Sequence, residues 1–316
     1  MRTAARALQP GAGETSRMLE IKPLSSCPHL SRPRPRSGRL RTQGVSEAAL
    51  REEVDEYFQV GARVSAGDIV VDVGANVGAF ALAAAEQVDG DLTLHCFEPA
   101  APTFAILQEN FHANPLLQRA RHTLHCAALT RPDEAGAERD FYFFKRLPTD
   151  STYDIVGKRL EFERFFAGHA VRLEREMSVV PLIGRALGGG VRAVIERLSS
   201  PESPLGVWLT NQFTGLATMR CWTDTLGGWA RAARVPRIDL MKIDVEGAEL
   251  HVLEGVGGFW PRVRQVVVET NEHGGMRQRV TDLLRAKGFG AIEAYRPRLA
   301  ALRGTDNVLL RASRSD

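Results

Sequence analysis

Residues 68–80 read Asp-Ile-Val-Val-Asp-Val-Gly-Ala-Asn-Val-Gly-Ala-Phe, and this stretch decides the fold. A β-branched run ends at Asp72 and turns through Gly74 and Gly78 into the alanine-rich segment 79–86. That order predicts a buried parallel strand, a tight turn and the start of a helix. Backbone N–H groups at the helix N-terminus would face a ligand above the strand end, and the Asp72 carboxylate is expected to point there too. The stretch therefore predicts a nucleotide-cofactor site.

The spacing of the glycines narrows the kind of cofactor. A dinucleotide fingerprint needs G-x-G-x-x-G, and here Asn76 stands where the second glycine belongs. The frame acid-x-Gly-x-Asn-x-Gly, from Asp72 to Gly78, is similar to the first motif of S-adenosylmethionine (SAM) methyltransferases. We therefore expect Gly74, Ala75, Asn76 and Gly78 to contact the cofactor, although a glycine-rich turn can also serve tight packing alone.

A second apolar run, residues 92–97, is closed by Glu98 and Pro99. In a doubly wound sheet the carboxylate that binds a ribose follows the second strand. Glu98 and Pro99 are therefore candidate cofactor-binding residues.

The segment 242–249 reads Lys-Ile-Asp-Val-Glu-Gly-Ala-Glu. Together with the frame at 72–78, it makes the chain resemble the FkbM-type methyltransferases, a branch of the class I SAM-dependent fold, over residues 60–150 and 217–312. The resemblance implies an α/β fold with a doubly wound, mostly parallel, seven-stranded Rossmann-like sheet, and SAM as the cofactor. It also implies an O-methyltransferase acting on a hydroxyl of a small molecule, polyketide or glycan. The resemblance also implies an adenine wall at residues 126–129, with Cys126 and Ala127 as candidate cofactor contacts, although many relatives have Asn near Cys126.

Methyl transfer from a sulfonium is an in-line displacement, so the protein must align donor and acceptor and exclude water. A hydroxyl acceptor also benefits from a base near its proton. Asp244 and Glu246 follow a predicted strand, and one is expected to hold the SAM amino group while the other faces the acceptor. His273 is a further candidate base, and its alternative is an ordinary solvated loop residue.

No metal site is expected from the cysteines, because none of the four shows C-x-x-C spacing. Cys96 and Cys126 are predicted to be reduced thiols buried in core strands, the latter in a single third strand over 121–129. The sequence leaves open whether one metal ion is bound jointly by Asp244, Glu246, Glu269 and His273.

The ends and the middle of the chain differ from this core. Residues 1–46 hold nine basic and two acidic residues and are rich in Pro and Arg, which predicts a disordered tail over 1–45 or, alternatively, a transit peptide. The location would then be cytoplasmic or, with a transit peptide, mitochondrial or plastid. The remainder is mildly acidic, which gives nucleic-acid binding no support, and no apolar run is long enough to span a bilayer.

We expect one methyltransferase domain over 46–316, opened by a helix with Leu50, Val54, Tyr57 and Phe58 on its buried face. Its acids are predicted to form a solvated face; they are Glu52, Glu53, Asp55 and Glu56. The sequence of residues 153–216 predicts a helical insertion. This insertion is either a lid over the acceptor pocket, or a segment without a role in the site or an oligomer contact.

Two other functions are considered. An NAD(P)-dependent oxidoreductase of the short-chain type would need Tyr-x-x-x-Lys, which the chain lacks. A catalytically inactive SAM-binding module is disfavoured because the acids at the cofactor site are intact. The acceptor itself is not determined by the sequence.

Overall fold

The computed structural model describes residues 19–23, 38–43, 45–144, 215–298 and 305–314. The predicted insertion at 153–216 lies outside these residues, apart from its last two positions.

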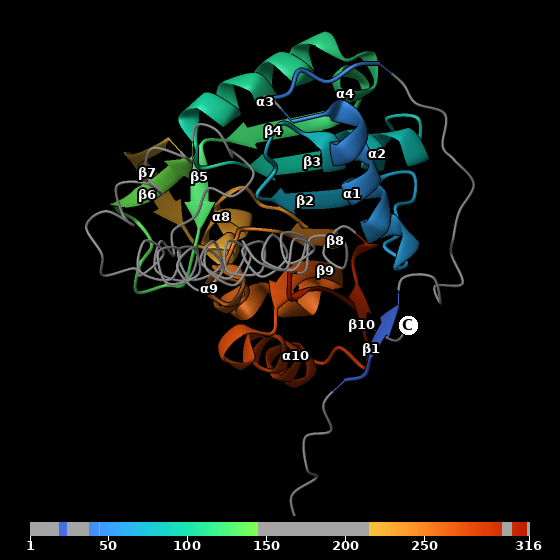
Figure 1. Cartoon of the computed structure of the whole chain (residues 1–316), viewed down its shortest axis with the longest axis vertical. Coiled ribbons are helices and arrows are strands. Elements are labelled where there is room, and N and C mark those ends of the chain that lie inside the picture. The colour runs from blue at the N-terminus through green and yellow to red at the C-terminus, as the bar shows by residue number, and fades with distance from the viewer. Residues whose placement is uncertain (1–18, 24–37, 44, 145–214, 299–304, 315–316) are drawn as a thin grey trace, which may run out of the picture.

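The main sheet is doubly wound and mostly parallel, as predicted (Figure 1). Its strand order is β1-β10-β11-β9-β8-β2-β3-β4. The parallel strands of the centre are β2 (Asp68–Val73), β3 (Leu92–Phe97), β4 (Arg121–His125), β8 (Ile238–Ile243) and β9 (Val263–Asn271). The antiparallel pair β10 (Ala291–Arg296) and β11 (Asn307–Ser313) extends the sheet beyond β9, and β1 (Ile21–Pro23) adds an eighth strand.

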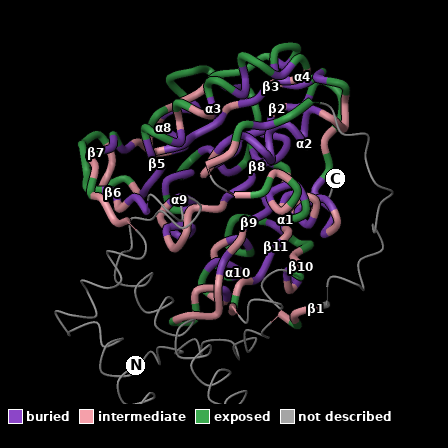
Figure 2. The backbone as a smooth tube through the Cα atoms, turned by 45° about the horizontal axis from the view of Figure 1, so that its top comes forward, coloured by how far each residue is buried: buried purple, intermediate pink, exposed green. Residues whose placement is uncertain are grey.

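Helices cover both faces of this sheet and bury two separate cores. Figure 2 marks the buried residues along the backbone in purple. Alternation along β2 separates them, because Val70 packs with one set of helices and Val71 and Val73 with the other. The first set is α1 (Glu47–Gln59), α2 (Ala79–Gln87), α3 (Ala101–Ala113) and α4 (Pro115–Arg119). The second is α8 (Leu226–Ala232), α9 (Glu249–Gly255), η3 (Gly257–Arg262) and α10 (Met276–Ala286).

A smaller sheet stands beside the carboxyl end of the main one. Its order is β5-β7-β6, with β5 (Ala127–Leu129), β7 (Leu216–Asp224) and β6 (Glu138–Phe144). The prediction of one strand over 121–129 is therefore wrong. The chain leaves the main sheet after His125, whose carbonyl accepts from Glu98 N at 3.0 Å, and Ala127 then pairs with β7. Cys126 lies between the two strands and is exposed, contrary to prediction, whereas Cys96 is buried.

Two pieces of the N-terminal segment pack on the folded body, so the prediction of a wholly disordered tail over 1–45 is wrong. Strand β1 pairs in parallel with β10, and Leu40 is buried in the first core. The backbone of Arg41 exchanges hydrogen bonds of 2.8 and 2.9 Å with the side chain of Asn110. Few apolar residues are enough to hold these two pieces, because each residue packs against a core that the rest of the domain forms.

The acids of α1 also differ from expectation. Only Glu52 is exposed, while Glu56 is 2% exposed and accepts a hydrogen bond from Arg298 N at 2.9 Å. Glu53 lines a cavity. The helix packs against more than one neighbour, so its polar face is only partly solvated.

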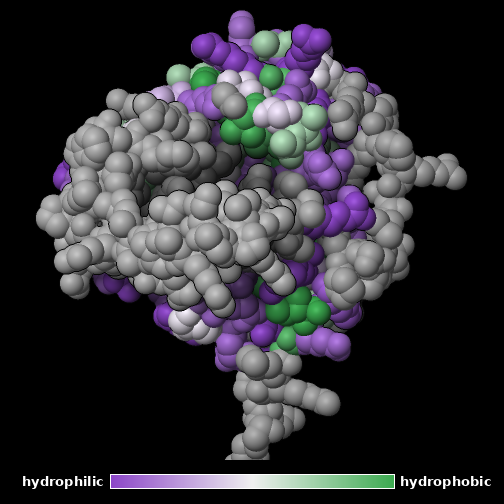
Figure 3. Space-filling model, viewed as in Figure 1, coloured by the Kyte–Doolittle hydropathy of each residue, from purple (hydrophilic) through white to green (hydrophobic). Residues whose placement is uncertain are grey.

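The described surface in Figure 3 is mostly hydrophilic, with small separate hydrophobic groups. None of the helices in the described part of the chain is long and apolar enough to cross a membrane.

Candidate functional site

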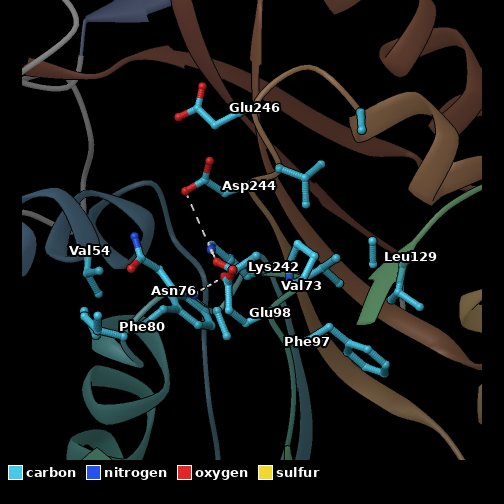
Figure 4. Close-up of a pocket in the computed structure, with 18 of the residues that line it drawn as sticks. Val54, Val73, Asn76, Phe80, Phe97, Glu98, Leu129, Lys242, Asp244 and Glu246 are labelled. Atoms are coloured by element: carbon cyan, nitrogen blue, oxygen red, sulfur yellow. Dashed lines mark hydrogen bonds and ion pairs between the residues drawn. The ribbon is translucent and has the colours of Figure 1, made fainter. Parts of the chain in front are cut away.

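A cavity of about 970 Å³, counting its open mouth, lies at the carboxyl ends of β2, β3 and β8 (Figure 4). Strand β2 is flanked by β3 on one side and β8 on the other, so the cavity sits where the strand order reverses. Open α/β sheets bind ligands at such a switch point. Eight of the predicted site residues line it: Gly74, Ala75, Asn76, Glu98, Pro99, Ala127, Asp244 and Glu246.

The other four predicted residues lie elsewhere. Asp72 is fully buried beneath the cavity. Gly78 has φ of 89° and faces the side chains of α3, so its closest packing is against a helix. Cys126 is exposed between β4 and β5, and His273 begins the short helix η4 (His273–Gly275) after β9. None of the four is among the residues that line the cavity in the described structure.

The turn after β2 is held tightly against its neighbours. The N–H groups of Gly74 and Ala75 donate to the Phe97 carbonyl at 3.0 and 2.9 Å. Gly74 has φ of 75°, and a Cβ there would lie 1.8 Å from the Asp244 carbonyl oxygen. Asn76 has φ of 49°, a left-handed backbone that Asn tolerates better than most residues. The glycine is therefore required by the close approach of β2 and β8.

Glu98 joins this turn to the end of β3. Its Oε2 accepts from Asn76 N at 3.0 Å and its Oε1 from Ala100 N at 2.9 Å. Burial raises the pKa of Glu98 to about 7, while the two backbone donors work in the opposite direction. Each carboxylate oxygen has a second lone pair, so Glu98 can also accept from ligand hydroxyls.

Lys242 lies at the floor of the cavity and pairs with acids. Its Nζ donates to the Gly74 carbonyl at 2.7 Å and lies 3.3 Å from Asp72 Oδ1 and 3.6 Å from Asp244 Oδ2. Burial opposes its charge, but the neighbouring carboxylates outweigh burial and raise the pKa of Lys242. Asp72 and Lys242 also lie opposite each other on the neighbouring strands β2 and β8, so their ion pair links the two strands.

Tyr57 connects Asp244 to a second carboxylate. Its hydroxyl lies 3.0 Å from Asp244 Oδ2 and 3.0 Å from Glu269 Oε2. Asn307 Nδ2 donates to Glu269 Oε1 at 2.7 Å. Sequence reasoning missed the role of Tyr57, because a buried aromatic on the apolar face of a helix carries no sign of a polar partner.

Carboxylate oxygens of Glu53, Asp244 and Glu269 lie within 4.8 Å of one another. Glu246 and His273 do not join this group, so the four-residue ion site that the sequence left open does not form among the described residues.

Glu246 is presented by a turn with an unusual backbone. Its φ is 53° and that of Gly247 is 104°. The buried carboxylate of Glu249 accepts from Gly247 N at 2.8 Å and so supports the turn from beneath. Asp244 and Glu246 reach the same side of the cavity, opposite Asn76 and Glu98 (Figure 4).

A family model described as the methyltransferase FkbM domain matches residues 72–291. The chain belongs to the FkbM methyltransferase family. It is 29% identical over 245 residues to 31-O-demethyl-FK506 methyltransferase FkbM of Streptomyces tacrolimicus, covering 77% of this chain and 81% of that protein. It is also 29% identical to methyltransferase sdnD of Sordaria araneosa, covering 72% of this chain and 76% of that protein.

Among solved structures, a precorrin-6y C5,15-methyltransferase from Geobacter metallireducens GS-15 aligns with 88% of this chain and 94% of its own. The sequence identity is 9% and the TM-score is 0.38, and this similarity is too low to compare the two sites.

This FkbM-family chain is a SAM-dependent methyltransferase, and its cavity suits that cofactor. Acids predominate among the charged residues of the lining, namely Glu53, Glu98, Asp244 and Glu246 against Lys242. They complement a cofactor that carries positive charge on its sulfur and amino group. Glu98 would hold the ribose hydroxyls, and apolar side chains such as Phe97 and Leu129 would lie against the adenine.

Proposed function

We propose that this enzyme is an O-methyltransferase whose acceptor is a hydroxyl of a small molecule, polyketide or glycan. The observation that carries the proposal is the state of Asp244. One of its oxygens, Oδ2, is engaged by Tyr57 and Lys242, and its side chain still lines the cavity. A carboxylate anchored through one oxygen can offer the other to a hydroxyl proton.

When bound, SAM would supply an electrophilic methyl group to the acceptor oxygen, with SAH as the leaving group. On the protein side, Asp244 Oδ1 accepts a hydrogen bond from the acceptor hydroxyl and takes its proton as the O–C bond forms. Glu246, on the neighbouring turn, contributes negative charge toward the cofactor's amino group. The apolar wall of the cavity excludes water from the transfer, and its members include Val54, Phe80 and Phe141.

The relative from Streptomyces tacrolimicus supports an oxygen acceptor, since its name gives a 31-O-demethyl substrate. The mildly acidic body gives no reason to propose a nucleic-acid acceptor. We propose that the segment 153–216, of which all but the last two residues lie outside the described structure, selects the acceptor or forms an oligomer contact.

The test is product analysis with SAM that carries a ¹³C-labelled methyl group. The protein is incubated with pooled hydroxylated polyketides, sugars, carboxylic acids and amines, and the labelled product is examined by NMR. We expect the label on a hydroxyl oxygen, and an Asp244→Asn variant that binds S-adenosylhomocysteine (SAH) but transfers methyl at least ~100-fold more slowly. A label on nitrogen or carbon would refute the proposal.

A further inference from the structure

We infer that Tyr57 and Glu269 are positioning residues of the methyl-transfer site. A proton held on Glu269 turns the Tyr57 hydroxyl toward Asp244, and this determines which oxygen of Asp244 faces the acceptor. The inference rests on the proposed role of Asp244. Tyr57 and Glu269 act through that carboxylate and need not touch the acceptor.

The Tyr57 hydroxyl stands between two carboxyl groups. The Tyr57 oxygen lies 3.0 Å from an oxygen of Asp244 and 3.0 Å from an oxygen of Glu269. A phenol has one proton and can donate to only one of them. Tyr57 is 1% exposed, and burial together with the nearby acids raises its pKa well above the ordinary value, so it stays protonated. The second contact therefore requires a proton on one of the carboxyl groups.

The two acids differ in the charges that surround them. The ammonium of Lys242 lies 3.6 Å from Asp244 Oδ2. Glu269 has no basic group within ion-pair distance among the described residues. Lost hydration, together with the negative charges of Asp244 and Glu53, raises the pKa of Glu269 to about 8. Glu269 therefore carries the proton at neutral pH.

The amide of Asn307 sets the direction of the hydrogen bonds from Glu269 to Asp244. Asn307 Nδ2 donates to Glu269 Oε1, so the proton sits on Oε2, the oxygen that faces Tyr57. Glu269 then donates to Tyr57, and Tyr57 donates to Asp244 Oδ2. Lys242 is closest to the same Oδ2. In the described residues no hydrogen bond reaches Asp244 Oδ1, which is the oxygen left for the acceptor.

The charged and titratable groups around these hydrogen bonds come from several helices and strands. They are Glu53 on α1, Asp72 on β2, and Lys242 and Asp244 at the end of β8. Asp72 and Lys242 form an ion pair, so their charges largely offset one another. Glu53 and Asp244 remain as the groups that disfavour ionisation of Glu269.

The experiment compares the full-length, ligand-free wild type with Glu269→Gln, which mimics the protonated acid, and with Glu52→Gln as a control from the exposed surface of α1. Urea unfolding is followed from pH 5 to pH 9. Because the pKa of Glu269 is raised in the folded state, its proton favours folding at low pH, and this contribution is lost as pH rises through about 8. We expect the urea midpoint of the wild type and the control to fall over this interval more than that of Glu269→Gln. Equal slopes in all three proteins would overturn the inference.

Infrared spectroscopy gives a test that does not depend on how stable Glu269→Gln is. At pH 7, the wild type should show a carbonyl band of a protonated carboxyl group that shifts in Tyr57→Phe, because the phenol oxygen that accepts its proton is gone. An unchanged band in Tyr57→Phe would contradict the proposed hydrogen bonds from Glu269 to Tyr57 and from Tyr57 to Asp244. Stabilisation of chelator-treated wild type, but not of Glu269→Gln, by Mg²⁺ or Mn²⁺ would also overturn it, since the carboxylates would then hold a cation instead of a proton.

With an acceptor available, Tyr57→Phe should bind SAH as the wild type does but transfer methyl at least ~10-fold more slowly, because Asp244 is no longer oriented. The wild-type single-turnover rate should fall above pH 8, and that of Glu269→Gln should not. If the product proves not to be an O-methyl compound, the proposed function fails, whereas the unfolding and infrared results still decide the proton on Glu269.

Discussion

Replacing Gly74 by Ala tests the contact between the cofactor turn and the segment after β8 that carries Asp244 and Glu246. The new Cβ would lie 1.8 Å from the Asp244 carbonyl oxygen and 2.9 Å from its carbonyl carbon. Favourable contacts lie near 3.5 Å, so the end of β8 must recede by more than about 1 Å. The left-handed φ of 75° adds about 1–2 kcal/mol for a residue with a side chain. With about 1–3 kcal/mol for overpacking, the folded state should lose roughly 2–5 kcal/mol.

Gly67→Ala is the matched control, because Gly67 has φ of 79° and nothing within 4 Å of an added Cβ. It should lose only the backbone contribution of about 1–2 kcal/mol and keep its affinity for SAH. Urea unfolding measures the free energy of unfolding of both variants, and calorimetric titration measures SAH binding. Gly74→Ala should bind SAH at least ~10-fold more weakly, since the cofactor turn and Glu246, which faces the cofactor's amino group, are both displaced. Wild-type affinity in a folded Gly74→Ala protein would refute the placement of the cofactor at this turn.

Three further predictions concern single side chains. Glu98→Ala should lose about 1.5–3 kcal/mol of SAH binding, roughly 10- to 150-fold in Kd by calorimetry, because charge-assisted hydrogen bonds to the ribose are removed; unchanged affinity would show that Glu98 does not hold the ribose. Leu40→Ala should lower the free energy of unfolding by about 2–5 kcal/mol, since this side chain is buried in the first core; a loss below 1 kcal/mol would mean that the segment does not pack there in solution. Burial raises the pKa of Glu249 to about 7, so its protonated form favours the folded state, and this contribution is lost as pH rises from 4.5 to about 7. Glu249→Gln should therefore lose less stability than the wild type between pH 4.5 and pH 8, and parallel pH profiles would contradict the assignment.

The central fold follows from local signals in the chain. The β-branched run at 68–73, the glycines at 74 and 78 and the alanine-rich segment beyond them specify a strand, a turn and a helix without help from distant residues. The same holds for Glu98 after β3 and for Asp244 after β8, because parallel strands bring their carboxyl ends to one edge. Most of the predicted cofactor residues therefore line one cavity.

Other features depend on contacts that no local pattern records. The Tyr57 hydroxyl meets acids that lie 187 and 212 residues further along the chain. Strand β1 is only three residues long and is defined by its pairing with β10. The division of 121–129 at Cys126 follows from the partner strand β7, which lies beyond residue 214. The cellular location stays a prediction.

The central proposal is that Asp244 serves the acceptor and is not needed to hold the cofactor. The most direct measurement determines the SAH dissociation constant and the single-turnover rate of methyl transfer side by side for Asp244→Asn and the wild type. We predict a rate at least ~100-fold lower with SAH affinity within about threefold of the wild type, because a misplaced or unassisted acceptor slows only the transfer. A variant that loses SAH affinity and keeps its rate at saturating SAM would contradict the proposal.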